Sequence, residues 1–240
     1  MIPRLHCQQT ISGRSHSLAP AAAHHALRVL RLRAGDEVVL FDGSGGEWPG
    51  RLREEGRGLQ VELGQWRAVE REAALLLTLA QALPGGDKMD WVVQKAVELG
   101  VATIQPLEAS RSVVRLSGER AEKRHAHWQQ VAIAACEQCG RNRLPVLSPL
   151  LPLAGFLAQQ AAPGELRLLL APDEGARLGA LPRPIALTLL VGPEGGFSEA
   201  EREMVHAAGF QSLTLGPRVL RTETAGLAAV AAALALWGDF

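Results

Sequence analysis

The 240-residue sequence contains no tyrosine, only three cysteines and no long hydrophobic run. Without tyrosine, no mechanism that needs a phenol is open to this chain. Three cysteines cannot form a disulfide framework in a chain of this length, and they are typical of a reducing compartment. The longest apolar stretch, residues 225–237, is too short to span a bilayer and is predicted to be a buried helix. The N-terminus lacks the apolar run of a signal peptide, so we expect a cytoplasmic protein with no membrane segment.

The chain also has no net charge, because 25 lysines and arginines balance 25 aspartates and glutamates. Taken over the whole chain, this neutrality argues against a nucleic-acid partner. The charges are unevenly distributed, however: residues 1–35 hold five arginines and no acid, whereas residues 36–70 hold eight acids. Residues 111–143 are basic again. The two basic segments suit a phosphate-contacting surface, or else exposed faces that acids elsewhere in the fold neutralise.

Hydrophobic patterning divides the chain near residue 72. The first seventy residues contain short strand-like runs at 37–41 and 59–63 between glycine-rich turns, which predicts a small β-barrel or sandwich. Strands and helices alternate afterwards, which predicts an α/β domain with a largely parallel sheet. The predicted strands are 75–83, 101–107, 166–171, 186–191 and 212–215, and the predicted helices are 87–100, 117–139, 198–209 and one that begins near 222. The expected helix caps are Asp87, the pair Ser198 and Glu201, and Thr222.

The strongest local signal is the loop Gly192-Pro193-Glu194-Gly195-Gly196, which joins a dense apolar strand to a capped helix. In open α/β sheets, ligands bind at such junctions. The loop lacks both the dinucleotide fingerprint and the lysine of a phosphate-binding loop. Because its only ionisable group is the carboxylate of Glu194, it favours a ligand that is uncharged or cationic there. An ordinary strand-to-helix connection is the alternative.

A second strand–loop–helix junction occupies residues 215–225. Its loop contains Arg218 and Arg221, one of which could face a polyanion. Glu223, in the first turn of the following helix, suits the positive end of the helix dipole. A loop held only by surface salt bridges is the alternative.

These two junctions together closely resemble the RsmE family, the methyltransferases that make N3-methyluridine in small-subunit (16S) ribosomal RNA. The resemblance extends over nearly the whole chain. It includes residues 87–100, 111–114, Glu137-Gln138 with Arg141 and Pro145, Pro3-Arg4, and Val29-Leu30-Arg31 with Gly35-Asp36.

The resemblance implies a two-domain α/β protein. Residues 1–72 would form a PUA-like β-barrel that binds RNA, and residues 73–240 a SPOUT domain with a deep trefoil knot near its C-terminus, a rare exception to the no-knot rule. It further implies a homodimer, the cofactor S-adenosylmethionine bound in the knot, and a substrate of small-subunit rRNA or the assembled subunit. This cofactor has no phosphate and carries a sulfonium cation, in agreement with the charge of the glycine loop.

The resemblance also implies the residues of the sites. The cofactor pocket would be formed by Leu170, Ala171, Gly192, Pro193, Glu194, Gly195, Gly196, Leu215, Gly216, Leu220, Thr224 and Ala225. Methylation of uracil N3 requires the imide proton to leave, so an arginine near the uracil oxygens could stabilise the developing anion. We assign this role to Arg221, with Glu223 or Glu194 as the proton acceptor; Glu223 could equally serve only the helix dipole. The expected RNA contacts are Arg4, Arg28, Arg31, Arg111 and Arg141.

Two positions depart from the family pattern. Gly85 stands where many relatives carry lysine or arginine, and Ala109-Ser110-Arg111 replaces a common Ser-Glu-Arg. Each departure puts one expected contact in doubt.

Other interpretations are weaker. Cys136 and Cys139 have the spacing of a zinc or redox pair, but no second pair accompanies them, so we predict ordinary helix cysteines and no metal. The histidines at 24, 25, 125 and 127 likewise lack further ligands at metal spacing. A nucleotide-dependent Rossmann enzyme is disfavoured by the missing fingerprint. A catalytically silent RNA-binding or ribosome assembly factor on the same scaffold remains the alternative function.

Overall fold

The structure is a computed structural model that describes residues 2–56, 58–173 and 175–240. The chain forms two compact units. The first comprises Met1–Glu72 and Ile133–Leu144, and the second Ala73–Ala132 and Pro145–Phe240. The first unit therefore ends near the expected boundary, but it also takes in residues 133–144, which sequence patterning placed in the second domain.

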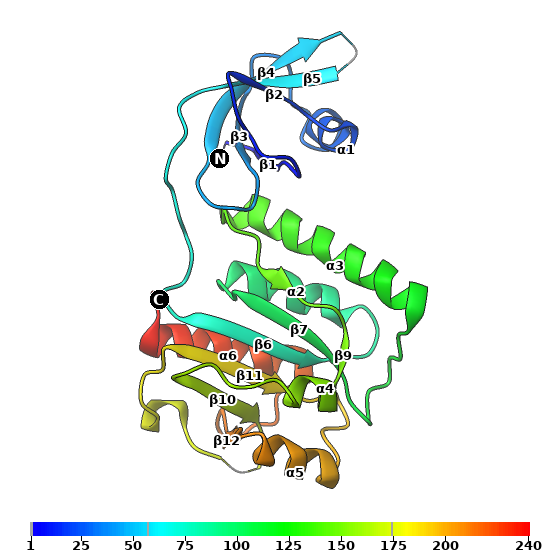
Figure 1. The fold of residues 1–240 in the computed structure, drawn as a ribbon, viewed down its shortest axis with the longest axis vertical. Coiled ribbons are helices and arrows are strands. Elements are labelled where there is room, and N and C mark those ends of the chain that lie inside the picture. Colours follow the sequence, from blue (N-terminus) through cyan, green and yellow to red (C-terminus); the bar gives the residue numbers. More distant parts are fainter. Residues whose placement is uncertain (1, 57, 174) are drawn as a thin grey trace. The chain divides into compact units, whose positions relative to one another are not determined.

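The N-terminal unit contains a five-stranded sheet in the order β1-β3-β4-β5-β2 (Figure 1). Its strands are β1 (Arg4–His6), β2 (Ser15–Ser17), β3 (Glu37–Phe41), β4 (Trp48–Glu55) and β5 (Gly58–Leu63). β1 and β3 pair in parallel, and the other strand pairs found among the described residues of this unit are antiparallel. The predicted strands at 37–41 and 59–63 are confirmed. Strands β1, β2 and β4 escaped detection because they are short or carry polar and charged residues on most positions.

A short helical segment follows β2. Helix α1 (Pro20–His24) continues into a π-helical turn, η1 (His25–Val29), whose Ala26 is buried. The core beneath it is formed by alternating strand residues, among them Leu5, Leu40 and Val61. Arg31, just after η1, has a positive φ of 57°.

The second unit is built on a parallel sheet in the order β12-β10-β11-β6-β7-β8, with β9 also pairing with β7. The strands are β6 (Leu76–Ala82), β7 (Thr103–Glu108), β8 (Val146–Leu147), β9 (Leu151–Pro152), β10 (Glu165–Leu170), β11 (Ala186–Val191) and β12 (Gln211–Leu213). The helices are α2 (Lys88–Glu98), α3 (Gly118–Cys139), α4 (Leu153–Leu157), α5 (Glu199–Ala207) and α6 (Thr222–Trp237), with a 3₁₀ turn η2 (Leu178–Ala180). The predicted α/β alternation is confirmed; the sequence did not predict α4.

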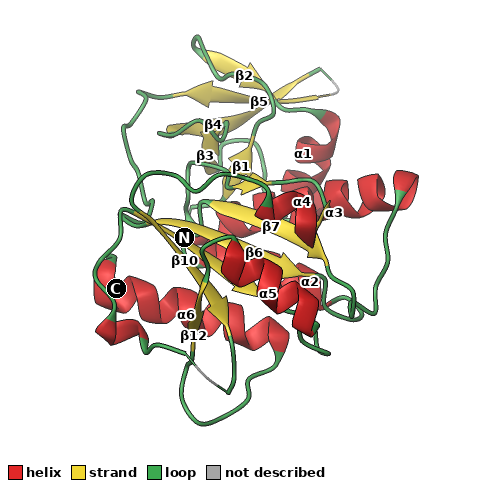
Figure 2. Ribbon diagram, turned by 60° about the horizontal axis from the view of Figure 1, so that its bottom comes forward, coloured by secondary structure: helices red, strands yellow, loops and turns green. Residues whose placement is uncertain are grey.

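Helices cover both faces of this sheet (Figures 1 and 2). Alternate strand residues such as Ala80 and Leu190 pack with α4 and α5 in one cluster. The intervening strand residues, on the other face of the sheet, pack against α6, which approaches the sheet closely at Gly226. A Cβ at Gly226 would lie 3.0 Å from Leu79 Cδ1 and 3.1 Å from Val191 Cγ2, so a larger residue here would force these side chains to shift by a few tenths of an ångström. The expected buried helix at 225–237 lies within α6, and no helix in the described ranges is long and apolar enough to cross a membrane.

The predicted helix caps have three different outcomes. Ser198 and Glu201 form the predicted capping box of α5. Asp87 occupies the N-cap position of α2, but its carboxylate accepts a hydrogen bond from Arg124 rather than from the helix. The prediction for Thr222 is wrong: Arg221 is the N-cap of α6 and Thr222 is its first residue, with a hydroxyl that bonds elsewhere.

Candidate functional site

A cavity of about 550 Å³ lies at the carboxyl ends of β10, β11 and β12. Because parallel strands end at the same edge of a sheet, the loops that follow them meet there. The cavity is lined by the segments 169–172, 191–197, 212–216 and 218–223, together with Lys88, Arg202, His206 and Ala225. Its volume lies in the range of pockets that enclose small molecules.

The structure brings nearly all of the predicted pocket residues together. Both junctions singled out in the sequence contribute to the wall, and among the twelve predicted residues only Thr224 lies outside it. Thr224 lies in the first turn of α6. Because successive side chains in an α-helix point about 100° apart, the residues of this turn cannot all face one cavity. Sequence patterning missed Lys88 and Phe197, since neither lies in a glycine loop. Phe197 packs on the loop, with its ring 3.3 Å from where a Cβ of Gly192 would lie.

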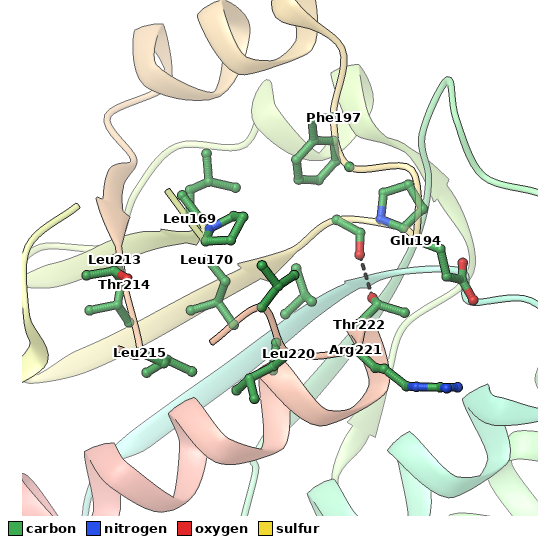
Figure 3. A pocket seen from close by; sticks show the side chains of 18 of the residues that line it. Leu169, Leu170, Glu194, Phe197, Leu213, Thr214, Leu215, Leu220, Arg221 and Thr222 are labelled. Carbon is green, nitrogen blue, oxygen red and sulfur yellow. Dashed lines mark hydrogen bonds between the residues drawn. The ribbon is translucent and has the colours of Figure 1, made fainter. Parts of the chain in front are cut away.

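The middle of the cavity is apolar. Leu170, Leu215 and Leu220 project toward the same space in Figure 3. Between these side chains the wall is formed by main chain at the strand ends and in the glycine loop, which carries both donors and acceptors. Such a surface suits a flat apolar ring whose polar edge bonds to the main chain.

A buried hydrogen-bond chain joins the two loops. The Thr222 hydroxyl donates to the carbonyl of Gly192, shown as the dashed line in Figure 3, and accepts a 2.9 Å bond from Gln81 Nε2. Gln81 is fully buried in β6, and its Nε2 also donates to its neighbour Ala82. Thr222 therefore fixes the start of α6 against the glycine loop, thirty residues earlier in the chain.

Two carboxylates and one lysine form the charged end of the cavity. Lys88 Nζ lies 3.1 Å from Glu194 Oε1 and 3.4 Å from Glu223 Oε1. The backbone N–H of Gly85 donates a further 2.9 Å bond to Glu194 Oε1. Burial raises the pKa of Glu194, but the hydrogen bonds from Gly85, its own backbone and Lys88 outweigh it and leave this pKa below its usual value. Glu194 is therefore a poor proton acceptor.

Arg221 lines the same end of the cavity as Glu194 (Figure 3). Its side chain is exposed, and no hydrogen bond or ion pair to its guanidinium is found within the described ranges. Its donors are thus open to a bound molecule.

A third loop, residues 109–112, buttresses the glycine loop. Arg111 Nη1 donates a 3.0 Å bond to the carbonyl of Gly195. The backbone N–H and hydroxyl of Ser110 each donate a 2.7 Å bond to the carboxylate of Glu201, which also accepts from the N–H of Ser198. Ser110 therefore has a partner of its own here, in spite of its departure from the family pattern.

Loss of the Ser110–Glu201 bonds is expected to destabilise the second unit. Ser110→Ala removes a hydrogen bond to a buried carboxylate, which costs about 1.5–3 kcal/mol of unfolding free energy. Burial raises the pKa of Glu201, but the hydrogen bonds from Ser110 and Ser198 outweigh it and lower this pKa overall. This contribution is therefore present above the ordinary glutamate pKa and is lost as the pH falls through the depressed value. Urea titrations from neutral to acidic pH measure it.

A double-mutant cycle provides the control. Glu201→Gln alone should remove most of the pH-dependent contribution, and adding Ser110→Ala to it should cost little more. Fully additive losses would mean that the two side chains do not act together.

The predicted RNA-contacting arginines separate into two groups. Arg28, Arg31 and Arg111 are exposed. Arg4 and Arg141 are buried in ion pairs with Glu47 and Glu72, and their side chains are only 7% and 4% exposed. A phosphate cannot reach these two guanidinium groups, so the structure removes Arg4 and Arg141 from the predicted RNA surface.

Cys136, His125 and His127, weighed as metal ligands in the sequence, lie in environments that do not suit a metal site. Burial raises the pKa of Cys136 to about 12, which disfavours the thiolate form needed for metal or redox chemistry. The Nε2 atoms of His125 and His127 lie against the Leu147 carbonyl and the Asp90 carboxylate. Across the ranges that the structure describes, no group of three or more histidine, cysteine, aspartate or glutamate residues is placed to hold a metal ion.

Comparison with known proteins agrees with this geometry. A family profile described as an RNA methyltransferase domain matches residues 71–234, and one described as an RNA methyltransferase PUA domain matches residues 18–63. The ribosomal RNA small subunit methyltransferase E of Bacillus subtilis is 31% identical over 236 residues, covering 94% of this chain and 91% of that protein. The chain belongs to the ribosomal RNA small subunit methyltransferase E family. The resemblance predicted from the two loops is thereby confirmed, as is an α/β protein with a PUA domain.

Solved structures of this family share the whole fold. A ribosomal RNA small subunit methyltransferase E from Neisseria gonorrhoeae, bound to S-adenosyl methionine, is 40% identical with a TM-score of 0.92. A Legionella pneumophila protein described as a putative methyltransferase, in complex with the bound cofactor SAM, is 37% identical with a TM-score of 0.94. Each alignment covers 100% of both chains.

Proposed function

We propose that this family member transfers the methyl group of S-adenosylmethionine to N3 of a specific uridine in small-subunit (16S) ribosomal RNA. The cavity at the ends of β10, β11 and β12 is the observation that carries the proposal. It joins both loops by which the sequence resembles the family, in a chain whose solved relatives bind this cofactor.

The residues of the cavity fit S-adenosylmethionine. The apolar middle with its main-chain donors and acceptors suits adenine and ribose, and the carboxylates of Glu194 and Glu223 offset the charge of Lys88 at the end where a sulfonium would lie. When bound, the cofactor supplies an electrophilic methyl group. The residues that would hold it are Leu170, Ala171, Gly192, Pro193, Glu194, Gly195, Gly196, Leu215, Gly216, Leu220 and Ala225.

The free guanidinium of Arg221 supports a role in catalysis. Loss of the imide proton places negative charge on the uracil oxygens, and Arg221 would stabilise it. Of the two expected proton acceptors, Glu223 and Glu194, Glu223 would take this role. The bonds that Glu194 already accepts from Gly85 and Lys88 favour Glu223.

Two measurements test the proposed function. Calorimetry should show S-adenosylmethionine binding, and nucleoside mass spectrometry should show that N3-methyluridine disappears from small-subunit rRNA when the gene is deleted and returns on complementation. RNA binding without cofactor binding would instead support a catalytically silent assembly factor. Persistence of the modified nucleoside in a strain with no second enzyme for it would refute the proposal.

We further propose that residues 1–72 act as a PUA-like RNA-binding domain and residues 73–240 as a SPOUT domain with a trefoil knot. The PUA profile at residues 18–63 supports the first part. The knot is proposed from the resemblance of residues 192–196 and 215–225 to the family. Closing the termini of an experimentally determined backbone and testing it for a knot decides the matter.

The exposed arginines of the N-terminal unit provide a prediction for RNA binding. Charge reversal of Arg28 or Arg31 should reduce the slope of log affinity against log salt by about one for each lost phosphate contact. Arg53→Glu is the matched control, since exposed Arg53 already pairs with Glu62 in the same unit. Titration of small-subunit rRNA at several salt concentrations measures the slopes, and equal slopes in all variants would contradict the RNA surface.

A cytoplasmic homodimer completes the proposed function, with rRNA or the assembled subunit as its partner. The homodimer is proposed from the family resemblance. Sedimentation equilibrium should show twice the chain mass of 25.6 kDa.

A further inference from the structure

The charged end of the cavity holds two cations, Lys88 and Arg221, and two carboxylates, Glu194 and Glu223. We infer that Lys88, Glu223 and Arg221 bind the Watson–Crick edge of the target uracil, with the Glu223 carboxylate facing N3–H and the two cations facing the ring oxygens. This inference rests on the proposed function, because it assigns the specificity of the same site.

Glu223 has an acceptor capacity that the protein does not use. Its side chain is 14% exposed and lines the cavity. Oε2 is buried and has no hydrogen-bond partner among the described residues, and Oε1 has only Lys88 Nζ at 3.4 Å. A buried polar group without a partner is uncommon and costs free energy, so an under-used carboxylate at a cavity wall calls for an explanation. Glu194 differs, since one of its oxygens already accepts two hydrogen bonds.

The two cations supply the flanking donors. An ammonium group has three N–H donors, and Lys88 directs two of them toward Glu194 and Glu223. The hydrogen bond to Glu194 raises the pKa of Lys88, so the group stays protonated. Arg221 lines the same cavity, and its exposed guanidinium has no partner among the described residues, so it is free to donate.

This order selects uracil over cytosine. The Watson–Crick edge of uracil presents an acceptor, the N3–H donor and a second acceptor, which complements donor, acceptor and donor on the protein. Cytosine presents an amino donor and an unprotonated N3. Its amino group would face a cation, and its N3 lone pair would face the carboxylate. The site would reject cytosine because polar groups of both the base and the protein would be left without hydrogen-bond partners.

The proposed contact between Glu223 and N3–H also supplies an acceptor for the imide proton. The N3–H bond breaks and its proton passes to the Glu223 carboxylate. The electron pair left on N3 forms the bond to the methyl carbon as the carbon–sulfur bond breaks, with its electrons remaining on sulfur. Glu223 would thus be a catalytic residue as well as a recognition residue.

Glu223→Gln and Lys88→Met test the inference. The target uridine is first located by mass spectrometry, and small-subunit particles are then assembled on rRNA with uridine or cytidine at that position. In the presence of S-adenosylhomocysteine, the wild type should bind the uridine particle more tightly, and Glu223→Gln should bring the ratio close to one because glutamine can also donate to cytosine N3. Glu223→Gln should lower kcat by about 10²–10⁴-fold, and Lys88→Met by about 10–100-fold.

Lys95→Met is the matched control, because Lys95 is on the same helix, is 36% exposed against 35% for Lys88, and pairs with Glu98 outside the cavity. It should leave kcat and the uridine preference unchanged. Replacing the target with 5-fluorouridine, whose imide is more acidic, should partly restore methylation by Glu223→Gln. An unchanged uridine preference in Glu223→Gln overturns the inference, as does a tenfold loss of S-adenosylhomocysteine affinity alone, which would place Glu223 on the cofactor. If the wild type forms no N3-methyluridine at all, the proposed function fails instead.

Discussion

Replacing Arg4 by alanine is expected to lower the unfolding free energy of the N-terminal unit by about 3–5 kcal/mol. Arg4 Nη1 lies 2.8 Å from Glu47 Oε2, and each side chain is only 7% exposed. The guanidinium also bonds Asn142 and lies over the Phe41 ring, 5.2 Å from its centroid. Removing it would leave the carboxylate of Glu47 buried without this partner, which is the costly way to break a buried ion pair.

Arg51→Ala is the matched control for Arg4. It breaks an ion pair with Glu37 in the same unit, but the two side chains are 60% and 55% exposed, so the expected cost is about 0–1 kcal/mol. Urea unfolding followed by tryptophan fluorescence compares the two variants. If Arg4→Ala left stability unchanged while weakening RNA binding, Arg4 would be an RNA contact after all.

The Arg4 contribution should also depend on pH. Burial raises the pKa of Glu47, but bonds and charges from Arg4, Asn142 and Arg71 outweigh it and lower this pKa overall. The stabilisation is therefore complete above the ordinary glutamate value of 4.5 and is lost as the pH falls through the depressed value. Arg4→Ala should show a shallower loss of stability in acid than the wild type.

Arg221→Ala is expected to lower the kcat of RNA methylation by about 10²–10³-fold, the typical loss when one donor to a developing anion is removed. Because the guanidinium is exposed and has no partner among the described residues, its removal should leave stability within about 0.5 kcal/mol of wild type. The affinity for S-adenosylmethionine should change little if Arg221 acts on the uracil. Single-turnover methylation and calorimetry separate the two effects.

Two further variants support the interpretation of Arg221. Arg221→Lys keeps the charge but loses the planar fork, so an intermediate rate is expected if two donors are used. Arg183→Ala removes an exposed arginine that does not line the cavity and should keep the wild-type rate. Wild-type turnover in Arg221→Ala would exclude its role in catalysis.

The sequence alone determined the features that depend on short-range patterns. Helix α2 follows from apolar residues at helical spacing, and α5 from its capping box. The dense apolar run of β11 and the loop after it predicted a ligand site because a parallel strand that leads into a loop and a helix places that loop at a sheet edge. The individual pocket residues came from the family resemblance, and all but Thr224 line the cavity.

Only the tertiary structure decided which side chains meet across long separations. Lys88 and Glu194 are 106 residues apart, and Arg4 and Glu47 are 43 residues apart. The local sequence around each of these residues does not indicate which residue it pairs with. The sequence predicted that Thr222 caps α6, because a capping hydrogen bond joins residues close in the chain. The Thr222 hydroxyl instead donates to the carbonyl of Gly192. The physical reason is that periodicity and capping are set within one or two turns of chain. Burial and ion pairing are set by the packing of distant segments. This packing buries Arg4, a predicted RNA contact, in an ion pair with Glu47, and it places Lys88 in the wall of the cavity.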